Sequence, residues 1–451
     1  MIVHQNGSLL QRSIRHATYV NFPRPDDCSY LHMLPVEEQC EFVETTEACA
    51  ESEYYFNYVG YLYCTIGSDS EYLFNLGFVL LLCICVYYFV ILGTTADKFF
   101  CPTLAAIAKA LNISEALAGV TILAFGNGSP DLFTAVANPD ADTELMFSEL
   151  LGSAAFVIGV IGGTVLLIQP FDFPPWGISR DLAFFIAAIV WITLKAADER
   201  FNLYDSAILI GMYFLFLALV IWEFIQERQE QQRSQSTSAF IMIGKVYIFV
   251  WVVVIAVPLM VVIYYTSRTD RCPRYHKLFT LLSFFGCIQV IYVVAQEVVS
   301  VLETVGIVLK LSKSVLGLSL LAWGNSVGDL FSNVALARQG YGKMAFAACF
   351  GGPLLNLCLG LGLTLMTKAF GVQNLIADVR KGVMGENCEV YLFQILTTTW
   401  LCLLFTNFQG RPSVGLAMIV TYLMFLAFSF LGEFELIHPY GTDHHPDPNG
   451  A

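Results

Sequence analysis

The chain has 451 residues, of which 56% are hydrophobic and 13% are charged, and its formal net charge at pH 7 is −14. Soluble domains carry about 25% charged residues, so this composition excludes an ordinary soluble globule. The acidity also argues against nucleic-acid binding, which needs clustered cations. Continuous apolar runs long enough to cross a bilayer recur along the chain, which predicts membrane-spanning helices rather than the alternating strands of a barrel.

The first 72 residues form a polar N-terminal region with eleven Asp and Glu residues against three Arg residues. Residues 1–25 hold all three Arg and no acid, a pattern typical of an organelle presequence that lacks the apolar core of a secretory signal. Four cysteines follow, and they are Cys28, Cys40, Cys49 and Cys64. Their density predicts two disulfides in an oxidising compartment, with the pairing open and free thiols as the alternative.

A first membrane half is predicted over residues 73–224. The expected spans are 73–93, a span that begins just after Pro102 and runs into a Gly-rich motif, 145–168, 182–194 and 206–224. Residues 138–144 are an acidic turn before the third span, and Pro170, Pro174 and Pro175 end that span.

Residues 225–277 have a different composition. The polar, low-complexity stretch 226–238 indicates a flexible linker, and the apolar run 246–265 and a basic loop follow it. A second membrane half over 278–432 then precedes a polar tail at 433–451. The spans expected in this half are 279–299, 314–337, 344–365, 390–405 and 414–431.

The number of spans leaves the orientation of the two halves open. Five spans in each half would turn the second half upside down relative to the first. An additional span at 246–265 would leave both halves pointing the same way. The sequence does not decide whether this run crosses the membrane.

One fifteen-residue motif occurs in each half, at a constant offset of 198 residues. It reads GVTILAFGNGSPDLF from Gly119 to Phe133 and GLSLLAWGNSVGDLF from Gly317 to Phe331, with eight identical positions. Repetition within a hydrophobic chain is typical of transporters built from two related halves, whose binding site lies where the halves meet.

Each motif carries a carboxylate and an amide. Asp131 and Asp329 lie in apolar segments, where an acid costs roughly 2.5–3.5 kcal/mol and usually marks a site. Asn127 and Asn325 come four residues earlier, so amide and carboxylate share one helix face. The hydroxyl groups of two further candidates lie one to two turns before them: Thr121 and Ser319.

The first motif also contains Pro130, which has no N–H and therefore frees the carbonyl of Gly126. Unwound backbone inside a membrane is tolerated where it lines a cavity, and its carbonyls can coordinate cations. Gly328 stands at the matching position and keeps its N–H, so we expect the second helix only to loosen.

These groups form a set of hard oxygen ligands, which suits Ca²⁺, Na⁺ and Li⁺ better than zinc or copper. Two carboxylates can neutralise either one Ca²⁺ or two monovalent ions. Ca²⁺ and the monovalent ions would therefore compete for the same site, which predicts that the protein exchanges one for the other.

GNGSPDLF and GNSVGDLF resemble the alpha-repeats of the cation/calcium exchanger superfamily, and the resemblance covers nearly all of 73–431. Asn before Asp in both motifs resembles the mitochondrial sodium/calcium exchanger branch, which also carries lithium. ACFGGPLLN at Ala348–Asn356, KFFCP at Lys98–Pro102 and the four N-terminal cysteines fit that branch as well.

The resemblance implies an all-α membrane protein with two inverted five-helix repeats, about ten core helices in total. It implies Na⁺-driven extrusion of Ca²⁺ from the mitochondrial matrix across the inner membrane, with no enzymatic activity and no cofactor. The lipid bilayer and the transported ions are its implied partners. The ion-site residues that it implies are Asn127, Pro130, Asp131, Asn325, Ser326, Asp329, Gly352 and Asn356.

The chain departs from that pattern at three places. The long regulatory loop is reduced to a short linker, and a hydrophobic segment between the halves is missing, which would leave 246–265 unpaired. Glu149 stands where members of the family tend to be apolar, and we interpret it as an exposed acid at a helix end rather than a ligand.

The two halves are also expected to be unequal. Pairing Gly152 with Gly351 sets Val157 against Asn356, so the second half supplies an amide that the first half lacks.

Three other functions compete with this interpretation. One is a plasma-membrane or endomembrane exchanger coupled to K⁺ or H⁺, and another is a channel. The third is an intramembrane aspartyl protease, because Val327–Gly328–Asp329 is faintly similar to its Gly-x-Gly-Asp setting and two carboxylates can share a proton. The aspartates of such proteases lie in dissimilar motifs, whereas these lie in copies of one motif.

Overall fold

The structure is a computed structural model of the whole chain, and it describes most of the two membrane halves and part of the N-terminal region. The described residues are 28–46, 49, 56–66, 71–111, 113–128, 132, 143–197, 200–234, 276–309, 311, 313–371, 376–378 and 382–433. The stretches outside them include residues 1–27, Pro130, Asp131, 133–142, 235–275 with the run 246–265, and the tail from 434.

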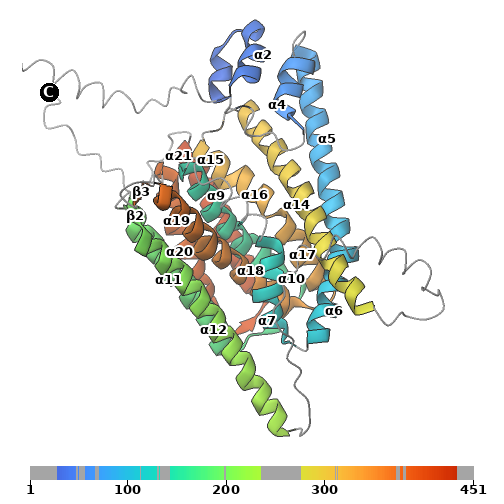
Figure 1. Cartoon of the computed structure of the whole chain (residues 1–451), viewed down its shortest axis with the longest axis vertical. Coiled ribbons are helices and arrows are strands. Elements are labelled where there is room, and N and C mark those ends of the chain that lie inside the picture. The colour runs from blue at the N-terminus through green and yellow to red at the C-terminus, as the bar shows by residue number, and fades with distance from the viewer. Residues whose placement is uncertain are drawn as a thin grey trace, which may run out of the picture.

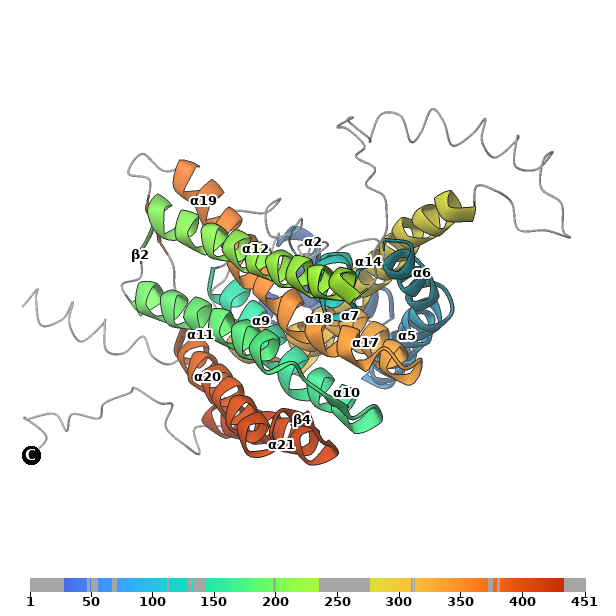
Figure 2. The same ribbon diagram turned by 90° about the horizontal axis from the view of Figure 1, so that it is seen from below.

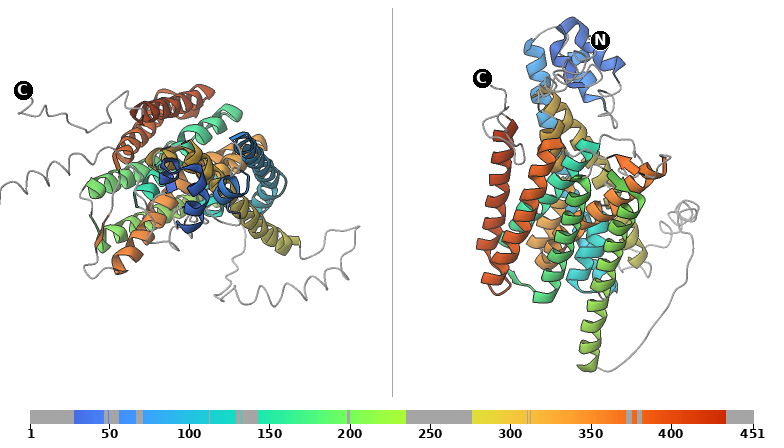
Figure 3. Two further views of the ribbon diagram at one scale, coloured as in Figure 1. Left: turned by 90° about the horizontal axis from the view of Figure 1, so that it is seen from above. Right: turned by 90° about the vertical axis from the view of Figure 1, so that its left-hand side faces the viewer.

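The N-terminal region forms a small helical cap at one end of a helical bundle (Figure 1; Figure 3, right). Its described elements are η2 (Cys28–Met33), α2 (Val36–Thr45), α4 (Tyr58–Gly60) and η3 (Tyr61–Ile66). Disulfides join Cys28 to Cys49 and Cys40 to Cys64, which confirms two disulfides and supplies their pairing. A cap this small has little core of its own, so cross-links of this kind contribute much of its stability.

The cap is tied to helix α14 (His276–Val308) by polar contacts. His32 Nε2 lies 2.6 Å from the backbone carbonyl of Ile307, close to the end of that helix. The Tyr58 hydroxyl donates to Glu297 Oε2 over 2.7 Å. Burial is the main cause that raises the pKa of Tyr58 far above its ordinary value, with Tyr88 and Glu297 adding to the shift, so the hydroxyl keeps its proton and stays a donor.

The first half is built from long helices interrupted by π-helical turns. Its helices are α5 (Glu71–Thr95), η4 (Ala96–Phe100), α6 (Cys101–Leu111), α7 (Glu115–Ala118), η5 (Gly119–Leu123), α9 (Thr143–Phe156), η6 (Val157–Gly162), α10 (Gly163–Ile168), α11 (Pro175–Ala197) and α12 (Leu203–Ser234). Residues 124–128 continue the helix after η5.

Two expected boundaries in this half are wrong. No new span starts after Pro102, because α5, η4 and α6 form one continuous helix to Leu111, and the wide turn η4 accommodates the proline that cannot donate an N–H. The flexible linker does not start at 226 either, because α12 continues to Ser234. Its Gln, Glu and Arg residues are good helix formers despite their low complexity.

The second half has the same kinds of elements. Its helices are α14 (His276–Val308), α15 (Lys313–Leu316), η7 (Gly317–Leu321), α16 (Ala322–Asn325), α17 (Val327–Arg338), α18 (Gly342–Leu354), η8 (Leu355–Gly360), α19 (Leu361–Gly371), α20 (Gly382–Phe405) and α21 (Pro412–Glu433). The expected all-α membrane fold is therefore confirmed.

Corresponding helices of the two halves run in opposite directions through the bundle. Helix α5 starts at the cap end and α14 starts at the opposite end, while α9 starts at the cap end and α18 at the opposite end (Figures 1 and 2). Helix α12 ends on the same side of the bundle as α14 begins. The complete layout of ten core helices stays a prediction, because 129–131, 133–142 and 235–275 lie outside the described residues.

Two short antiparallel sheets join the halves. Strand β1 (Phe171–Asp172) pairs with β4 (Gln409–Gly410), and β2 (Arg200–Asn202) pairs with β3 (Ile376–Asp378). Each strand connects two helices, so each sheet holds one connection of the first half against one of the second half at a bundle end.

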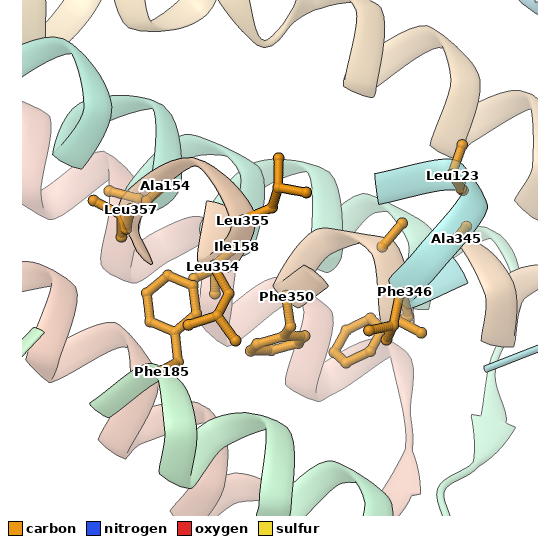
Figure 4. Packing of buried hydrophobic residues seen from close by; sticks show 14 of the residues in the cluster. Leu123, Ala154, Ile158, Phe185, Ala345, Phe346, Phe350, Leu354, Leu355 and Leu357 are labelled. Atoms are coloured by element: carbon orange, nitrogen blue, oxygen red, sulfur yellow. The ribbon is translucent and has the colours of Figure 1, made fainter. Parts of the chain in front are cut away.

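Small residues allow close helix packing within the bundle. A Cβ atom added at Gly163 of α10 would lie 2.6 Å from the carbonyl oxygen of Gly415 in α21, so these two backbones touch. Lipid tails are as apolar as protein side chains, so close contacts of this kind rather than a hydrophobic drive hold membrane helices together. The side chain of Leu354 on α18 lies beside Phe185 of α11, and Phe350 and Phe346 follow along the same helix (Figure 4).

Eight helices within the described ranges are long and apolar enough to cross a membrane. The two motif helices are not among them. The second motif helix is interrupted between α16 and α17, which is the pattern of the discontinuous helices that form transporter binding sites, and the first is described as far as Gly128.

Candidate ion-binding site

The sequence repeat is also a repeat of backbone geometry. The π-helical turns η5 and η7 begin at Gly119 and Gly317, the first residues of the two motifs, and so keep the 198-residue offset. The turns η6 and η8 begin at Val157 and Leu355 with the same offset. Single π-helical turns are rare and occur frequently at functional sites, so their matched positions point to the motif helices and their partners.

Each motif helix packs against a helix of the other half through a glycine. A Cβ atom added at Gly152 of α9 would lie 2.6 Å from the carbonyl oxygen of Leu318, and one added at Gly351 of α18 would lie 2.8 Å from Cα of Val120. Leu318 and Val120 occupy the same motif position, so the contacts confirm the pairing of Gly152 with Gly351. We call the region where the two motif helices pack against α9 and α18 the crossing.

Asn127 joins the two motifs directly. Its Nδ2 donates to Oδ1 of Asp329 over 2.7 Å and to Oγ of Ser332 over 2.8 Å. Its Oδ1 is buried and has no hydrogen-bond partner within the described part of the chain. A buried carbonyl oxygen without a donor is costly, and a bound cation would satisfy it.

The second motif helix is interrupted rather than loosened. Helix α16 ends at Asn325, Ser326 has φ −86° and ψ 3°, and α17 starts at Val327. The interruption lies before Gly328, where only a looser helix was expected. Asp329 consequently lies in the first turn of α17, where the N-terminal end of a helix stabilises negative charge.

Helix α9 contacts this interruption with two polar side chains. Asn325 Nδ2 donates to Oε1 of Glu149, and the hydroxyl oxygens of Ser153 and Ser326 lie 2.6 Å apart. The interpretation of Glu149 as an exposed acid at a helix end is therefore wrong. It lies in the second turn of α9, is only partly exposed, and is directed at the second motif.

Helix α18 and the π-helical turn η8 that continues it approach the first motif in the equivalent way. A Cβ atom added at Gly128 would lie 2.9 Å from Oδ1 of Asn356, which places Asn356 against the first motif. Gly352 is one turn earlier and buried, yet a Cβ atom added there would meet nothing within 4 Å. The missing side chain therefore leaves space in the interior next to Asn356.

The two predicted hydroxyl ligands already donate to their own helices. The Thr121 hydroxyl donates to the carbonyl of Leu117, and the Ser319 hydroxyl donates to that of Val315 over 2.6 Å. Their oxygens keep lone pairs, so both residues remain candidates, but each hydroxyl proton is committed to the backbone. Both donate into the turn before the π-helical segment.

The polar residues at the crossing combine carboxylate, amide and hydroxyl oxygens. Five of them keep part of their surface exposed: Asn127, Glu149, Asn325, Asp329 and Asn356. Their neighbours Gly128, Gly324, Ser326 and Gly352 are buried. Oxygen ligands of this kind suit Ca²⁺ and Na⁺. Pro130 and Asp131 lie outside the described residues, so their placement in the site stays a prediction.

Besides Glu149, two further residues at the crossing were not among the sequence-predicted ligands. Ser332 accepts from Asn127 and follows Asp329 by three residues, and Ser153 contacts Ser326 and follows Glu149 by four. Spacings of three and four place side chains on one helix face, so this rule alone would have selected both serines once the carboxylates were accepted as site residues.

Comparison with known proteins gives matches over both halves. The model of the family described as sodium/calcium exchanger protein matches residues 80–222 and 279–431. The mitochondrial sodium/calcium exchanger proteins of Mus musculus and Homo sapiens are 28% identical, and the alignments cover 93% and 94% of this chain and 92% of each relative. Cation/calcium exchanger 1 of Arabidopsis thaliana is 22% identical over 88% of each chain.

The fold is similar to that of a solved structure. The sodium-calcium exchanger NCX_Mj, in crystals soaked with 10 mM Na⁺ and without Ca²⁺, matches with a TM-score of 0.53 at 16% identity. The match covers 77% of this chain and 99% of that chain. At this level of identity the likeness concerns the fold alone.

Proposed function

Because this chain belongs to the sodium/calcium exchanger family, we propose that it is a secondary active antiporter that exchanges Na⁺ for Ca²⁺ across a membrane. Exchange requires that the two ions compete for one site that alternates between the two faces of the membrane. A site formed where two related halves cross meets this requirement, since movement of one half against the other opens it to either side.

One observation carries the proposal. Asn127 of the first motif donates to Asp329 of the second over 2.7 Å, and no described Lys, Arg or His forms an ion pair with Asp329. An acid inside a membrane bundle without a basic partner needs a cation or a proton to balance its charge. A transported cation would supply that balance, and its release would restore the hydrogen-bonded state.

We propose that the ion ligands come from both motifs and from the partner helix of the second half. Those predicted from the sequence and present in the described structure are Asn127, Asn325, Ser326, Asp329, Gly352 and Asn356, with Thr121 and Ser319 as outer hydroxyl candidates. Pro130 and Asp131 complete the proposed set by the symmetry of the motif. Li⁺ is a further hard monovalent ion that this set suits.

The compartment that we propose is the mitochondrial inner membrane, with Ca²⁺ leaving the matrix. The mammalian relatives named above are mitochondrial exchangers and match nearly the whole chain. The two disulfides of the cap support placing that end of the bundle in an oxidising space, away from the reducing matrix. The linker side of the bundle, where α12 ends, then faces the matrix.

The second candidate is an exchanger of the plasma membrane or endomembranes that is coupled to K⁺ or H⁺. This second candidate is supported by the similarity to a plant cation/calcium exchanger, because that relative also matches most of the chain. Membership of an ion-exchanger family stands against the intramembrane protease and against the channel.

Flux measurements on the purified chain in proteoliposomes test the proposal. Uptake of ⁴⁵Ca²⁺ is measured with Na⁺, Li⁺, K⁺ or H⁺ as the only opposing gradient. We expect rapid uptake with Na⁺, slower uptake with Li⁺, and none with K⁺ or H⁺. Uptake driven by K⁺ or H⁺ alone would favour the second candidate, and uptake without any opposing cation would indicate a channel.

A further inference from the structure

Glu149 is an acid within a candidate membrane span that the repeated motif does not include. It lies in α9 at a position inside the apolar span Met146–Ile168, so it is a membrane residue rather than part of the preceding loop. Under the pairing of Gly152 with Gly351, its counterpart in the second half is Ala348. The acid therefore belongs to one half only.

The carboxylate of Glu149 has an amide partner but no cationic one. Asn325 Nδ2 donates to its Oε1, and no Lys, Arg or His within the described ranges forms an ion pair with it. A neutral amide satisfies one lone pair of the carboxylate and leaves its charge unbalanced. An unbalanced acid inside a membrane bundle points to a cation pathway.

Glu149 lies beside the interruption of the second motif helix, where the proposed ion site is. Asn325 is the last residue of α16, and Ser326 at the interruption lies 2.6 Å, oxygen to oxygen, from Ser153 on the same face of α9. Asp329 follows in the first turn of α17. Two carboxylates therefore flank one helix interruption, with amide and hydroxyl oxygens between them.

We propose that Glu149 is a cation-binding acid of the transport site and that its charge favours the divalent ion over the monovalent one. The inference rests on the proposed Na⁺/Ca²⁺ exchange at this site. Coulomb attraction scales with the charge of the ion, so an added carboxylate contributes twice as much binding free energy for Ca²⁺ as for Na⁺. In affinity, the factor for Ca²⁺ is then about the square of the factor for Na⁺.

The experiment measures equilibrium binding of ⁴⁵Ca²⁺ and ²²Na⁺ to the purified full-length chain in detergent, in wild type and Glu149→Gln. Glutamine keeps an oxygen that accepts from Asn325 and removes only the charge. We expect the Kd for Ca²⁺ to rise at least ~10-fold and that for Na⁺ about 3-fold. The control is Glu115→Gln, which removes an exposed acid in the first turn of α7, and it should leave both constants unchanged.

Other results would overturn the inference. Unchanged binding in Glu149→Gln, or equal factors for the two ions, would mean that Glu149 only positions Asn325. If Glu149→Gln is not recovered as a folded protein, Glu149→Ala replaces it, because alanine is the residue at the counterpart position. The Kd for Ca²⁺ should again rise by about the square of the factor for Na⁺. Normal Ca²⁺ binding in either variant contradicts the proposal.

The binding assay separates this inference from the proposed function. Wild-type proteoliposomes that show no Na⁺-dependent Ca²⁺ flux would contradict the exchange function. Normal flux in the wild type together with unchanged ion binding in Glu149→Gln would contradict the role of Glu149 alone.

Discussion

Asn127 in the first motif and Asp329 in the second are joined by a hydrogen bond of 2.7 Å between Nδ2 and Oδ1, although 202 residues separate them. The contact places the amide of one motif on the carboxylate of the other, so the proposed ion site needs both halves. We therefore expect deletion of either half to remove the proposed site rather than to halve it.

Replacing Asp329 by Asn tests the charge at this contact. Asparagine keeps an oxygen that accepts from Asn127, so we expect a folded protein. A unit charge about 4 Å away contributes about 4 kcal/mol at an effective dielectric constant of about 20, and twice that for Ca²⁺, so Ca²⁺ flux should fall at least ~100-fold. Flux is measured in proteoliposomes at matched protein content. Asp172→Asn, an exposed acid of β1, is the control, and near-normal flux in Asp329→Asn would remove Asp329 from the site.

The packing of each motif helix against a helix of the other half depends on the two paired glycines. Gly152→Ala and Gly351→Ala each force a Cβ atom to within 2.8 Å or less of the backbone of the opposite motif. We expect both variants to lower the melting temperature in detergent and to slow transport. Gly211→Ala is a matched control, because a Cβ atom added there meets nothing within 4 Å and alanine favours the helix. Equal melting temperatures in all three variants would contradict this packing.

Gly352→Ala separates transport from stability. The added methyl group has open space, so we expect an unchanged or slightly higher melting temperature. The same group occupies the interior space next to Asn356, so Ca²⁺ flux should fall several-fold. Melting is followed by intrinsic fluorescence and flux by ⁴⁵Ca²⁺ uptake. A variant with full activity would show that this space is not part of the ion pathway.

The disulfides should stabilise the cap without building the ion site. They bridge sequence separations of 21 and 24 residues, and closing loops of this size stabilises the folded state by about 3 kcal/mol each. A variant with Cys28→Ser and Cys49→Ser should expose the cap to limited proteolysis while the bundle resists it and ion binding persists. Loss of Ca²⁺ binding in this variant would show that the cap is required for the site itself.

Labelling from the two faces of the membrane tests the orientation of the halves. Thr143 begins α9 and Gln339 lies shortly before α18, so the two positions mark the same end of corresponding helices in the two halves. In a background with Cys83→Ser, which removes an exposed thiol, single cysteines at the two positions should react with an impermeant reagent from opposite sides. Reaction of both from one side would mean parallel halves.

The sequence by itself determined the membrane class, the two halves and most of the proposed site. Long apolar runs dictate helices because a bilayer offers the backbone no other hydrogen-bond partners. The duplicated motif identified Asn127, Asn325 and Asp329 because polar groups inside such runs are too costly to persist without a role. The cysteine count predicted two disulfides, and the pairing of Gly152 with Gly351 was predicted with a one-residue shift from the motif offset.

Only the tertiary structure decided which groups meet. The pairing of Cys28 with Cys49 and the contact of Asn127 with Asp329 depend on the path of the chain in space, which local patterns do not record. Glu149 was misread for the same reason. Its immediate neighbours in the sequence suggest the start of a helix, but the acid is directed toward the second motif, because Gly152 lets α9 approach the backbone of Leu318.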